Sequence, residues 1–401
     1  MFSKNIPFAG IISGKEEEDA VLKVIRNKWT VEGSETELLQ NELCDFFGTK
    51  FACCVNSGSS ANLLALAALQ LSKDSIMLGS ACAFPASINP AIHLGLKLCL
   101  VDYDLNTLNI SLDQVEEALN KYNISVMLIA NTLGSCIDLD RLISLKNKYG
   151  FKLILDNCEA IGTKYNNQSI CTYGDIATIS TYPSHQLAGL GNGGAVLTSN
   201  EDIYKYILSA KSWGKQNARI GESYTKFTTS IDNIPYDENY TYTTIGYNMR
   251  TSDACSAYTR CQLKRLQEFI NIRQRNYLYL QNKLSIANIP LYYMSYPVQS
   301  KPAFFGFPIV LRQEGLRDKL VEHLEDNGVR CRLFFSGLLT IHPAYKNIPY
   351  LGAREFPVAT KLMKDALFIG VWPGLTIEDM EYTAQTIKDF FSDKSNQSSP
   401  T

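Results

Sequence analysis

Residues 51–71 read FACCVNSGSSANLLALAALQL: a short apolar run, a turn that contains Gly58, and a segment whose apolar residues recur at helical spacing. Similar apolar runs alternate with helical segments further along the chain: LKLCLVD (96–102), SVMLIAN (125–131), FKLILD (151–156), IATIST (176–181) and GGAVLTS (193–199). This alternation is typical of βα units. The sequence therefore predicts an α/β fold with a mostly parallel central sheet that is flanked by helices.

The chain beyond these runs carries different patterns. Residues 214–244 are polar, rich in Tyr and Asn and without period, which predicts a long loop. Residues 252–284 have apolar positions every three or four residues, which predicts one long helix. Strand-like and helix-like segments follow, such as FFGFPIVL (304–311) and TIEDMEYTAQTIKDFF (376–391).

The length of the chain bears on its domain organisation. A single hydrophobic core stops growing at roughly 250–300 residues, and this chain has 401. We therefore expect a large α/β domain over 1–250, a linking helix with a smaller C-terminal α+β domain over 251–392, and a disordered tail over 393–401.

Composition argues against several classes of protein. Hydrophobic residues make up 45% and charged residues 19%, as in compact globular proteins. The 38 basic and 40 acidic residues nearly balance, so charge gives no reason to expect nucleic acid or an anionic membrane as a partner. The first twenty residues lack the basic and apolar stretches of a secretion signal, and no run approaches ~20 apolar residues. We expect a soluble, cytoplasmic protein.

The eleven cysteines lie mostly in apolar stretches such as FACCV and LCLV, where cysteine usually packs as a small apolar residue. No C-x-x-C pair occurs, and the chain has only four histidines. These features argue against zinc-finger and thioredoxin-like sites, and no metal is expected.

The first candidate site is residues 57–62, SGSSAN, between the first predicted strand and its helix. A helix N-terminus after a glycine-bearing turn presents free backbone N–H groups and the positive end of the helix dipole, which suit a phosphate group. A serine-rich N-cap without any ligand explains the same residues. Taken alone, this stretch leaves both interpretations open.

The second candidate is Asp156, the last residue of the predicted strand FKLILD. Because open α/β sheets bind ligands at the carboxyl ends of their strands, its carboxylate is expected to face such a crevice. Against a pyridine ring nitrogen, it would keep that nitrogen protonated and make the ring an electron sink. An aspartate that only caps the next helix is the alternative.

The third candidate is residues 180–185, STYPSH, which Gly191, Gly193 and Gly194 follow. With it, five motifs stand in the order of the fold-type-I pyridoxal-phosphate enzymes: NSGSSANLLAL, LDNCEAIG, STYPSHQLAGLGNGGAVLTS, IGYNMRTSDACSAYTRCQLKRL and FIGVWPGLT. Over nearly its whole length the chain resembles the sugar-aminotransferase (DegT-like) family. The resemblance implies the fold-type-I fold and, as cofactor, pyridoxal 5'-phosphate or pyridoxamine 5'-phosphate.

His185 stands where most of that family carries the lysine that binds the cofactor covalently. Imidazole forms no stable Schiff base, so ordinary lysine-based transamination is not expected. The 3-dehydratase branch of the family has histidine at this place, and YPSH resembles that branch. An imidazole with an ordinary pKa near ~6.5 accepts and returns protons close to neutral pH. In the mechanism that the resemblance implies, His185 is the base that removes a proton from the cofactor while the C3 hydroxyl of the sugar leaves.

Three other interpretations remain open. The chain is an inactivated or substituted relative of the aminotransferases, a protein that binds a nucleotide sugar or cofactor without catalysis, or an aminotransferase that uses another lysine such as Lys211 or Lys215. The complete set of cofactor motifs argues against a mere binder, and neither lysine lies in the motif.

The resemblance also implies a set of ligand contacts. For the cofactor they are Gly58, Ser59 and Ser180 at the phosphate, Asp156 at the pyridine nitrogen, Glu159 near the ring hydroxyl or the substrate, and Phe84 on the ring. Asn248 would reach the cofactor phosphate of a neighbouring subunit, so a homodimer with shared active sites is expected. Less specific candidates for the sugar nucleotide are Trp213, Arg250, Arg332 and His342.

Cysteines distinguish two dehydratase types that share the histidine. One type resembles the CDP-sugar dehydrase with a [2Fe–2S] cluster, whose ligands come mostly from a Cys-rich segment after an SWG motif. Here the corresponding residues 212–244 contain no Cys, and Cys255 and Cys261 do not share a helix face. We therefore expect the other type, which resembles GDP-4-keto-6-deoxy-D-mannose 3-dehydratase and renews its cofactor from glutamate.

The expected activity is thus removal of the C3 hydroxyl from a nucleotide-linked 4-keto-6-deoxy sugar, as in the synthesis of deoxysugars for surface polysaccharides. The nucleotide stays open, because YPSH and FIGVWPGLT resemble the CDP-sugar branch more closely. The sequence does not distinguish a hexose from a heptose.

Overall fold

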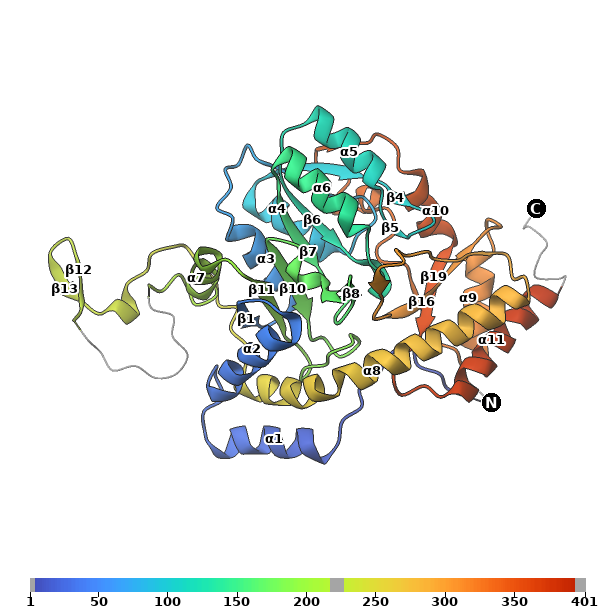
Figure 1. Ribbon diagram of the computed structural model, residues 1–401, viewed down its shortest axis with the longest axis horizontal. Coiled ribbons are helices and arrows are strands. Elements are labelled where there is room, and N and C mark those ends of the chain that lie inside the picture. Colours follow the sequence, from blue (N-terminus) through green and yellow to red (C-terminus); the bar gives the residue numbers. More distant parts are fainter. Residues whose placement is uncertain (1–3, 217–226, 394–401) are drawn as a thin grey trace.

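The computed structural model describes residues 4–216 and 227–393 and places one large sheet at the centre of the molecule (Figure 1). The sheet has eight strands in the order β1-β11-β10-β7-β6-β2-β3-β18, and only β11 runs antiparallel to its neighbours. Their bounds are β1 Phe51–Val55, β2 Ile76–Ser80, β3 Lys97–Val101, β6 Ile124–Ala130, β7 Lys152–Asp156, β10 Ile176–Ser180, β11 Gly194–Thr198 and β18 Tyr350–Gly352. The predicted α/β fold with a mostly parallel sheet is confirmed.

Helices cover this sheet because the segments between its strands carry apolar stripes. Val115, Ala118 and Leu119 of α5, for example, are all buried. The helices of the first 250 residues are α1 Lys15–Arg26, α2 Ser34–Phe47, α3 Gly58–Ala67, α4 Asn89–Leu94, α5 Leu112–Lys121, α6 Leu139–Tyr149 and α7 Glu201–Ala210. Two small sheets accompany the large one. One pairs β4 Tyr103–Asp104 with β5 Asn109–Ile110, and the other has three strands, β8 Lys164–Tyr165, β9 Gln168–Ser169 and β15 Ser300–Lys301.

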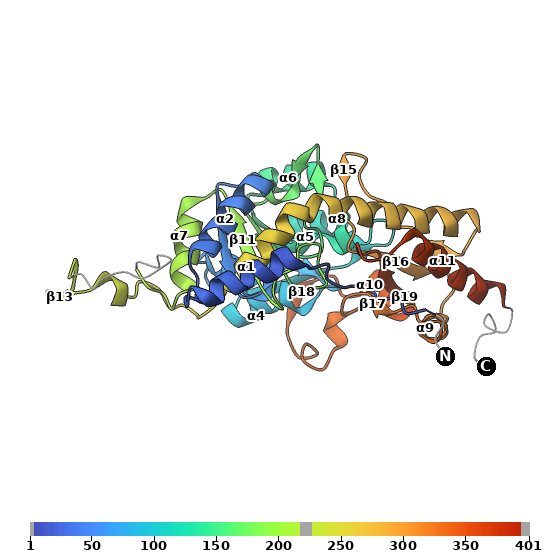
Figure 2. The same ribbon diagram turned by 90° about the horizontal axis from the view of Figure 1, so that it is seen from below.

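The predicted long helix is confirmed as α8, Asp253–Ile286, which runs past both sheets (Figures 1 and 2). A smaller antiparallel sheet lies beyond it, in the order β14-β16-β19-β17. Its strands are β14 Leu291–Tyr292, β16 Gly306–Leu311, β17 Cys331–Leu333 and β19 Ala366–Gly370, and its helices are α9 Arg317–Asp326, α10 Pro357–Asp365 and α11 Ile377–Ser392. The smaller C-terminal α+β unit is therefore present.

Two segments cross the boundary expected at residue 250. β18, from the C-terminal part, pairs in parallel with β3 of the large sheet. Near the N-terminus, Ile6 pairs with Val329 beside the small sheet. The exact domain limits stay a prediction, and the predicted disordered tail lies, except for Asp393, outside the described residues.

The long loop predicted over 214–244 contains two short strands in the part that the structure describes; residues 217–226 lie outside that part. A hairpin of β12 Thr229–Ile231 and β13 Ile234–Tyr236 projects from the body of the molecule (Figure 1). Its two-residue turn holds Asp232 and Asn233 at φ 50° and 67°. Asp and Asn adopt this left-handed region more readily than most residues, so the turn closes a hairpin without glycine.

The described part of the chain contains no helix that is long and apolar enough to cross a membrane.

Candidate active site

Three of the predicted motifs meet at one edge of the large sheet. Thr178 of β10 is paired with Asp156 at the end of β7, and Ser180 is paired with Gly194 of β11. Gly194 also faces Val55 at the end of β1, just before the start of α3. The carboxyl ends of β1, β7 and β10 therefore place the predicted phosphate stretch, Asp156 and Ser180 side by side, as expected of a ligand site in an open α/β sheet.

The start of α3 has the form of a phosphate cradle. Ser57 caps the helix, and its Oγ accepts a hydrogen bond of 3.1 Å from the backbone N–H of Ser60. A Cβ at Gly58 would lie 2.7 Å from Cβ of Ser180 and 2.9 Å from Sγ of Cys158. Only glycine lets these segments approach so closely, and Ser59 beside it is exposed. An anion at the N-terminus of α3, beside Ser59 and Ser180, would meet the positive end of the helix.

Asp156 is held from two sides and is only 6% exposed. One carboxylate oxygen accepts hydrogen bonds from Nδ2 of Asn62 at 2.7 Å and Oγ of Ser87 at 2.8 Å. The other accepts the backbone N–H of Cys158 at 3.1 Å. Asn62 is fixed in turn by the hydroxyl of Thr178, which donates to its Oδ1 at 2.6 Å. The network fixes the direction of the carboxylate at the end of β7.

Glu159 lies next to this network as a neutral acid. Burial raises the pKa of its carboxyl to about 8, the nearby charge of Asp156 adds to the rise, and the N–H of Leu133 opposes it. That N–H donates to Oε2 at 2.8 Å. Leu133 adopts φ 49°, an unusual conformation for a branched apolar residue, which aims its N–H at the carboxyl. At neutral pH Glu159 therefore keeps a proton that it can donate to a ligand oxygen.

His185 follows β10 in the turn that Tyr182 begins. Its ring packs at 5.2 Å from the ring of Phe305 and at 6.4 Å from that of Tyr182, centroid to centroid. Nδ1 is enclosed and has no hydrogen-bond partner among the described residues. Burial, and then the positive charge of Arg273, lower the pKa of the imidazole to about 3. The ring is therefore neutral at physiological pH in the protein without a ligand.

Two further residues hold His185 in place, and neither was predicted from the sequence. Arg273 of α8 is 1% exposed; its Nη1 donates to the carbonyl of Phe305 at 2.9 Å and its Nη2 to that of His185 at 3.3 Å. Nε2 of Gln186 donates to the carbonyls of Glu159 and Ala303. Arg273 lies on the buried face of α8 between Ile270 and Tyr277. An arginine at an apolar position of a predicted helix is the sequence feature that could have indicated its buried role.

Comparisons with known proteins give this site a family. A model of the DegT/DnrJ/EryC1/StrS aminotransferase family matches residues 12–388. The chain belongs to this family. The resemblance drawn from the five motifs is confirmed.

Several relatives of this DegT family are similar over almost the whole chain. The lipopolysaccharide biosynthesis protein RfbH of Salmonella typhimurium is 34% identical, covering 96% of this chain and 92% of the relative. The dTDP-4-dehydro-2,6-dideoxy-D-glucose 3-dehydratase of Saccharopolyspora spinosa is 31% identical, with 96% and 87% covered. The structure of the E. coli GDP-4-keto-6-deoxy-D-mannose-3-dehydratase with bound hydrated PLP is 27% identical, with a TM-score of 0.87 over 96% of this chain and 99% of that one. A second structure of such a dehydratase, also 27% identical with a TM-score of 0.86 over 96% and 100%, holds a trapped PLP–glutamate geminal diamine.

The remaining predicted residues of this DegT-family chain fall into two groups. Phe84 is 56% exposed and directly precedes the short turn whose Ser87 bonds Asp156, so it borders the site. Asn248, also exposed, pairs with Ser212 at the base of the projecting hairpin segment. Their roles, like those of the residues above, stay predictions.

Arg332 and His342 each contact other residues of the chain, and their predicted roles stay predictions. The guanidinium of Arg332 lies 4.1 Å from the ring centroid of Phe8, and Nε2 of His342 is 2.7 Å from the carbonyl oxygen of Ser336. Trp213 and Arg250, in contrast, pack against each other, with the guanidinium 4.5 Å from the indole centroid.

Lys211 does not fit the role of a cofactor-binding lysine. Its Nζ is buried in an ion pair with Glu32 at 2.8 Å and also donates to the carbonyl of Cys54 at 3.1 Å. Removing it from Glu32 would leave a buried carboxylate unpaired. Lys215 lies instead over the rings of Trp213 and Tyr240. The alternative of a second Schiff-base lysine therefore gains no support from the geometry.

Across the described ranges, no group of three or more His, Cys, Asp and Glu side chains is arranged to hold a metal ion. Sγ of Cys255 donates to the carbonyl of Asn192 at 2.9 Å, so this thiol is already used in a contact next to the glycine-rich turn.

Proposed function

We propose that this chain is a PLP/PMP-dependent 3-dehydratase that removes the C3 hydroxyl of a nucleotide-linked 4-keto-6-deoxy sugar, with a GDP-4-keto-6-deoxymannose-like substrate. The observation that carries the proposal is His185, whose Nδ1 has no partner among the described residues, next to a cofactor-type site in which neither Lys211 nor Lys215 is placed to hold a cofactor. Relatives named as 3-dehydratases, similar over 96% of the chain, support the reaction class.

The residues present fit a pyridoxamine or pyridoxal phosphate. The N-terminus of α3, beside Gly58 and Ser180, suits a phosphate, and the close packing of Ser180 and Cys158 against Gly58 leaves no room for a Cβ there. Asp156 faces the same edge of the sheet with its direction fixed, which suits a protonated ring nitrogen. The exposed ring of Phe84 offers a surface for stacking. When bound, the cofactor supplies an electron sink and an amine that condenses with the sugar ketone.

The protein side of the reaction is proton transfer. His185 would take a proton from the cofactor carbon that is attached to the pyridine ring, and the same imidazole would then return that proton to the departing hydroxyl. Tyr182 and Phe305 hold the imidazole in position. Glu159, which keeps its proton at neutral pH, donates a hydrogen bond to a ligand oxygen and so places no negative charge beside the leaving hydroxide.

Glutamate is proposed as the amino donor, as the PLP–glutamate adduct in one relative supports. The sugar loses one oxygen atom while glutamate becomes 2-oxoglutarate and ammonia, so no external reductase is required. The alternative of an iron–sulfur type finds no thiolate cluster among the described residues.

A homodimer with shared sites and a cytoplasmic location are proposed with it. Exposed apolar side chains crowd the projecting segment 227–245, among them Ile234 at 63% and Ile245 at 94% exposed. An exposed apolar surface of this kind favours contact with another protein surface, and a second copy of the chain is the proposed one.

The test is to incubate the purified protein with pyridoxal phosphate, glutamate and GDP-, CDP- and dTDP-linked 4-keto-6-deoxy sugars, and to measure ammonia and the mass of the sugar nucleotide. We expect one of them to become lighter by one oxygen atom, with ammonia released in equal amount. His185→Asn, which keeps a polar side chain of similar reach but no base, should stop the reaction while cofactor binding persists. Tight cofactor binding without turnover of any sugar would refute the proposal, and stoichiometric iron with acid-labile sulfide would favour the other type.

A further inference from the structure

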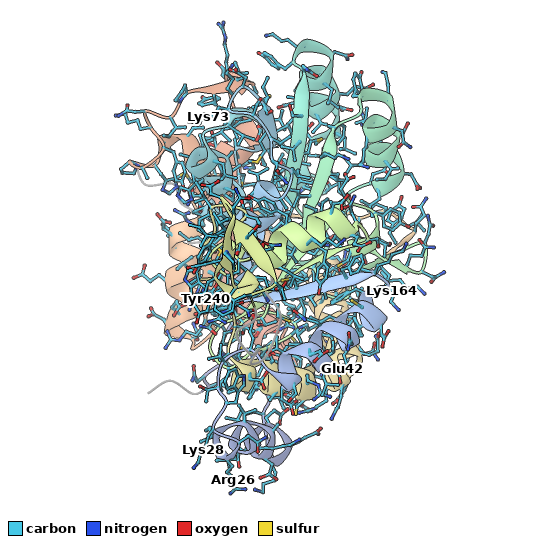
Figure 3. The ribbon with its side chains drawn as sticks, turned by 90° about the vertical axis from the view of Figure 1, so that its left-hand side faces the viewer. Arg26, Lys28, Glu42, Lys73, Lys164 and Tyr240 are labelled. Carbon is cyan, nitrogen blue, oxygen red and sulfur yellow. The ribbon has the colours of Figure 1, made fainter. Side chains whose placement is uncertain are left out.

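Trp213 stands at the centre of a group of side chains that the proposed reaction does not use. The guanidinium of Arg250 lies 4.5 Å from its ring centroid, and Nζ of Lys215 lies 5.5 Å from the same centroid. Nζ of Lys215 is also 5.6 Å from the ring of Tyr240, which Figure 3 labels on this end of the molecule. We call these four residues the tryptophan cluster. Trp213 is 40% exposed and Tyr240 56%, and Tyr240 belongs to the segment 227–245 for which contact with a second copy is proposed.

Backbone contacts fix the cluster in place. Trp213 adopts φ 60°, and its N–H donates to the carbonyl of Tyr247 at 2.7 Å. Met249, next to Arg250, donates its N–H to the carbonyl of Lys211 at 2.9 Å. A tryptophan held in the left-handed region is strained, and an ordinary surface loop would avoid that strain.

The two cations of the cluster lack counter-charges. Neither Arg250 nor Lys215 forms an ion pair with any carboxylate in the part of the chain that the structure describes, and Nε of Arg250 is buried without a partner. Comparable arginines that lie over rings are satisfied: Arg265 pairs with Glu17, and Nε of Arg312 donates to the carbonyl of Leu291. A buried, unpaired guanidinium donor favours an anionic ligand.

The cluster is also connected to the phosphate cradle. The carbonyl of Met249 accepts the N–H of Asn56 at 3.0 Å, and the carbonyl of Asn56 accepts the N–H of Gly193, also at 3.0 Å. Gly193 pairs with Ser57, the cap of α3. The backbone next to Arg250 is thus connected by two hydrogen bonds, through Asn56, to Gly193, which pairs with the cap of α3.

We propose that the tryptophan cluster binds the nucleoside diphosphate of the sugar-nucleotide substrate. Arg250 and Lys215 supply two positive charges for two phosphates, and the exposed aromatic faces offer a surface for the base. The inference rests on the proposed function in that it takes the substrate to be a sugar nucleotide. A single cofactor phosphate needs neither the second cation nor the rings.

The test uses the full-length protein and nucleoside diphosphates alone, with no sugar and no turnover. Binding of GDP, CDP and dTDP is measured by calorimetry and by Trp fluorescence, with Trp213→Phe identifying the signal of the cluster. Arg250→Met and Lys215→Met should each weaken the tightest of the three by about tenfold to a hundredfold, as expected for loss of a charge-assisted contact. Arg312→Met is the matched control, because it removes an arginine stacked on Tyr292 at 4.8 Å and should leave binding unchanged.

Binding of inorganic pyrophosphate and of pyridoxamine phosphate distinguishes a diphosphate site at the cluster from the site of the cofactor phosphate. We expect pyrophosphate binding to weaken in both variants and pyridoxamine phosphate binding to stay within about twofold. The inference is overturned if the wild type binds no nucleoside diphosphate, if both variants bind as the wild type does, or if pyridoxamine phosphate alone is affected. Diphosphate binding that depends on Arg250 and Lys215, without dehydration of any sugar, would refute the proposed function and leave this inference standing.

Discussion

Replacing Arg273 by methionine tests whether a buried charge contributes to the low pKa of His185. Methionine fills a similar volume but carries no charge and no donor. The variant removes hydrogen bonds to the carbonyls of Phe305 and His185, of which that to Phe305 at 2.9 Å is the shorter. Such bonds contribute about 1.5–3 kcal/mol each, but removing a buried, unpaired cation offsets the loss. We expect the free energy of unfolding to change by less than ~2 kcal/mol.

The pKa of His185 is the decisive quantity. It is lowered from 6.5 to about 3, with burial as the larger cause and Arg273 as the smaller one. Removing the positive charge favours the imidazolium, so the pKa should rise; because burial remains, it should stay well below 6.5. The charge accounts for less than half of the total shift, which gives an expected rise of about one unit, or ~1.4 kcal/mol.

The assay is NMR titration of the histidine ring protons. The chain has only four histidines, and His185→Gln identifies the signal. Arg275→Met is the matched control: it removes the same side chain from the same helix, but there the guanidinium donates to Asn276 and to the carbonyl of Leu375. A wild-type His185 that titrates near 6.5, or one whose pKa is the same in the Arg273 and Arg275 variants, would refute the reasoning.

Three further predictions concern the cofactor edge of the sheet. Because the folded pKa of Glu159 is about 8 against an ordinary 4.5, the native chain binds one proton more than the unfolded chain between these values, and stability falls as pH rises through the window. Glu159→Gln should therefore stabilise the cofactor-free protein at pH 8, by on the order of 2 kcal/mol in urea unfolding, and much less at pH 5; an equal effect at both would contradict this. Gly58→Ala places a Cβ 2.7 Å from that of Ser180, so pyridoxamine phosphate should bind at least about tenfold more weakly, with a stability loss of about 1–3 kcal/mol, and unchanged affinity would exclude the cradle. Asp156→Asn keeps the shape but removes the charge, so cofactor affinity measured by calorimetry should fall by about 2 kcal/mol without loss of fold. Asp104→Asn changes a half-buried carboxylate of β4 that accepts the backbone N–H of Thr107, and it should leave cofactor affinity unchanged.

Local patterns were sufficient for the elements and for the residues at strand ends. Asp156 closes an apolar run, and the rule that open α/β sheets bind ligands at the carboxyl ends of their strands placed it at the correct edge, whereas Ser180 was assigned only through the family resemblance. Gly58 was predicted from the strand, turn and helix around it. These inferences depend on residues that are close in sequence, which is the range over which periodicity carries information.

The supports of the site depend on long-range contacts and could not be predicted this way. Arg273 meets the carbonyl of His185 across 88 residues, and Gln186 meets that of Ala303 across 117. The left-handed backbone conformation of Leu133 could not be predicted from the sequence either, because leucine rarely adopts it. Only the fold shows that Asp232 and Asn233 close a hairpin, since the polar composition around them suits a loop as well.

The unbroken course of α8 limits how the molecule can move. The helix has 34 residues and no proline or glycine, so it spans about 50 Å as one stiff rod. Asp253 at its start accepts the backbone N–H groups of Gly33 and Thr36, and Asn276 further along donates to the carbonyls of Val371 and Leu375. A hinge between the two lobes would have to bend the rod or break one of these anchorages. We therefore expect ligands to enter and leave without a change in the distance between the two lobes.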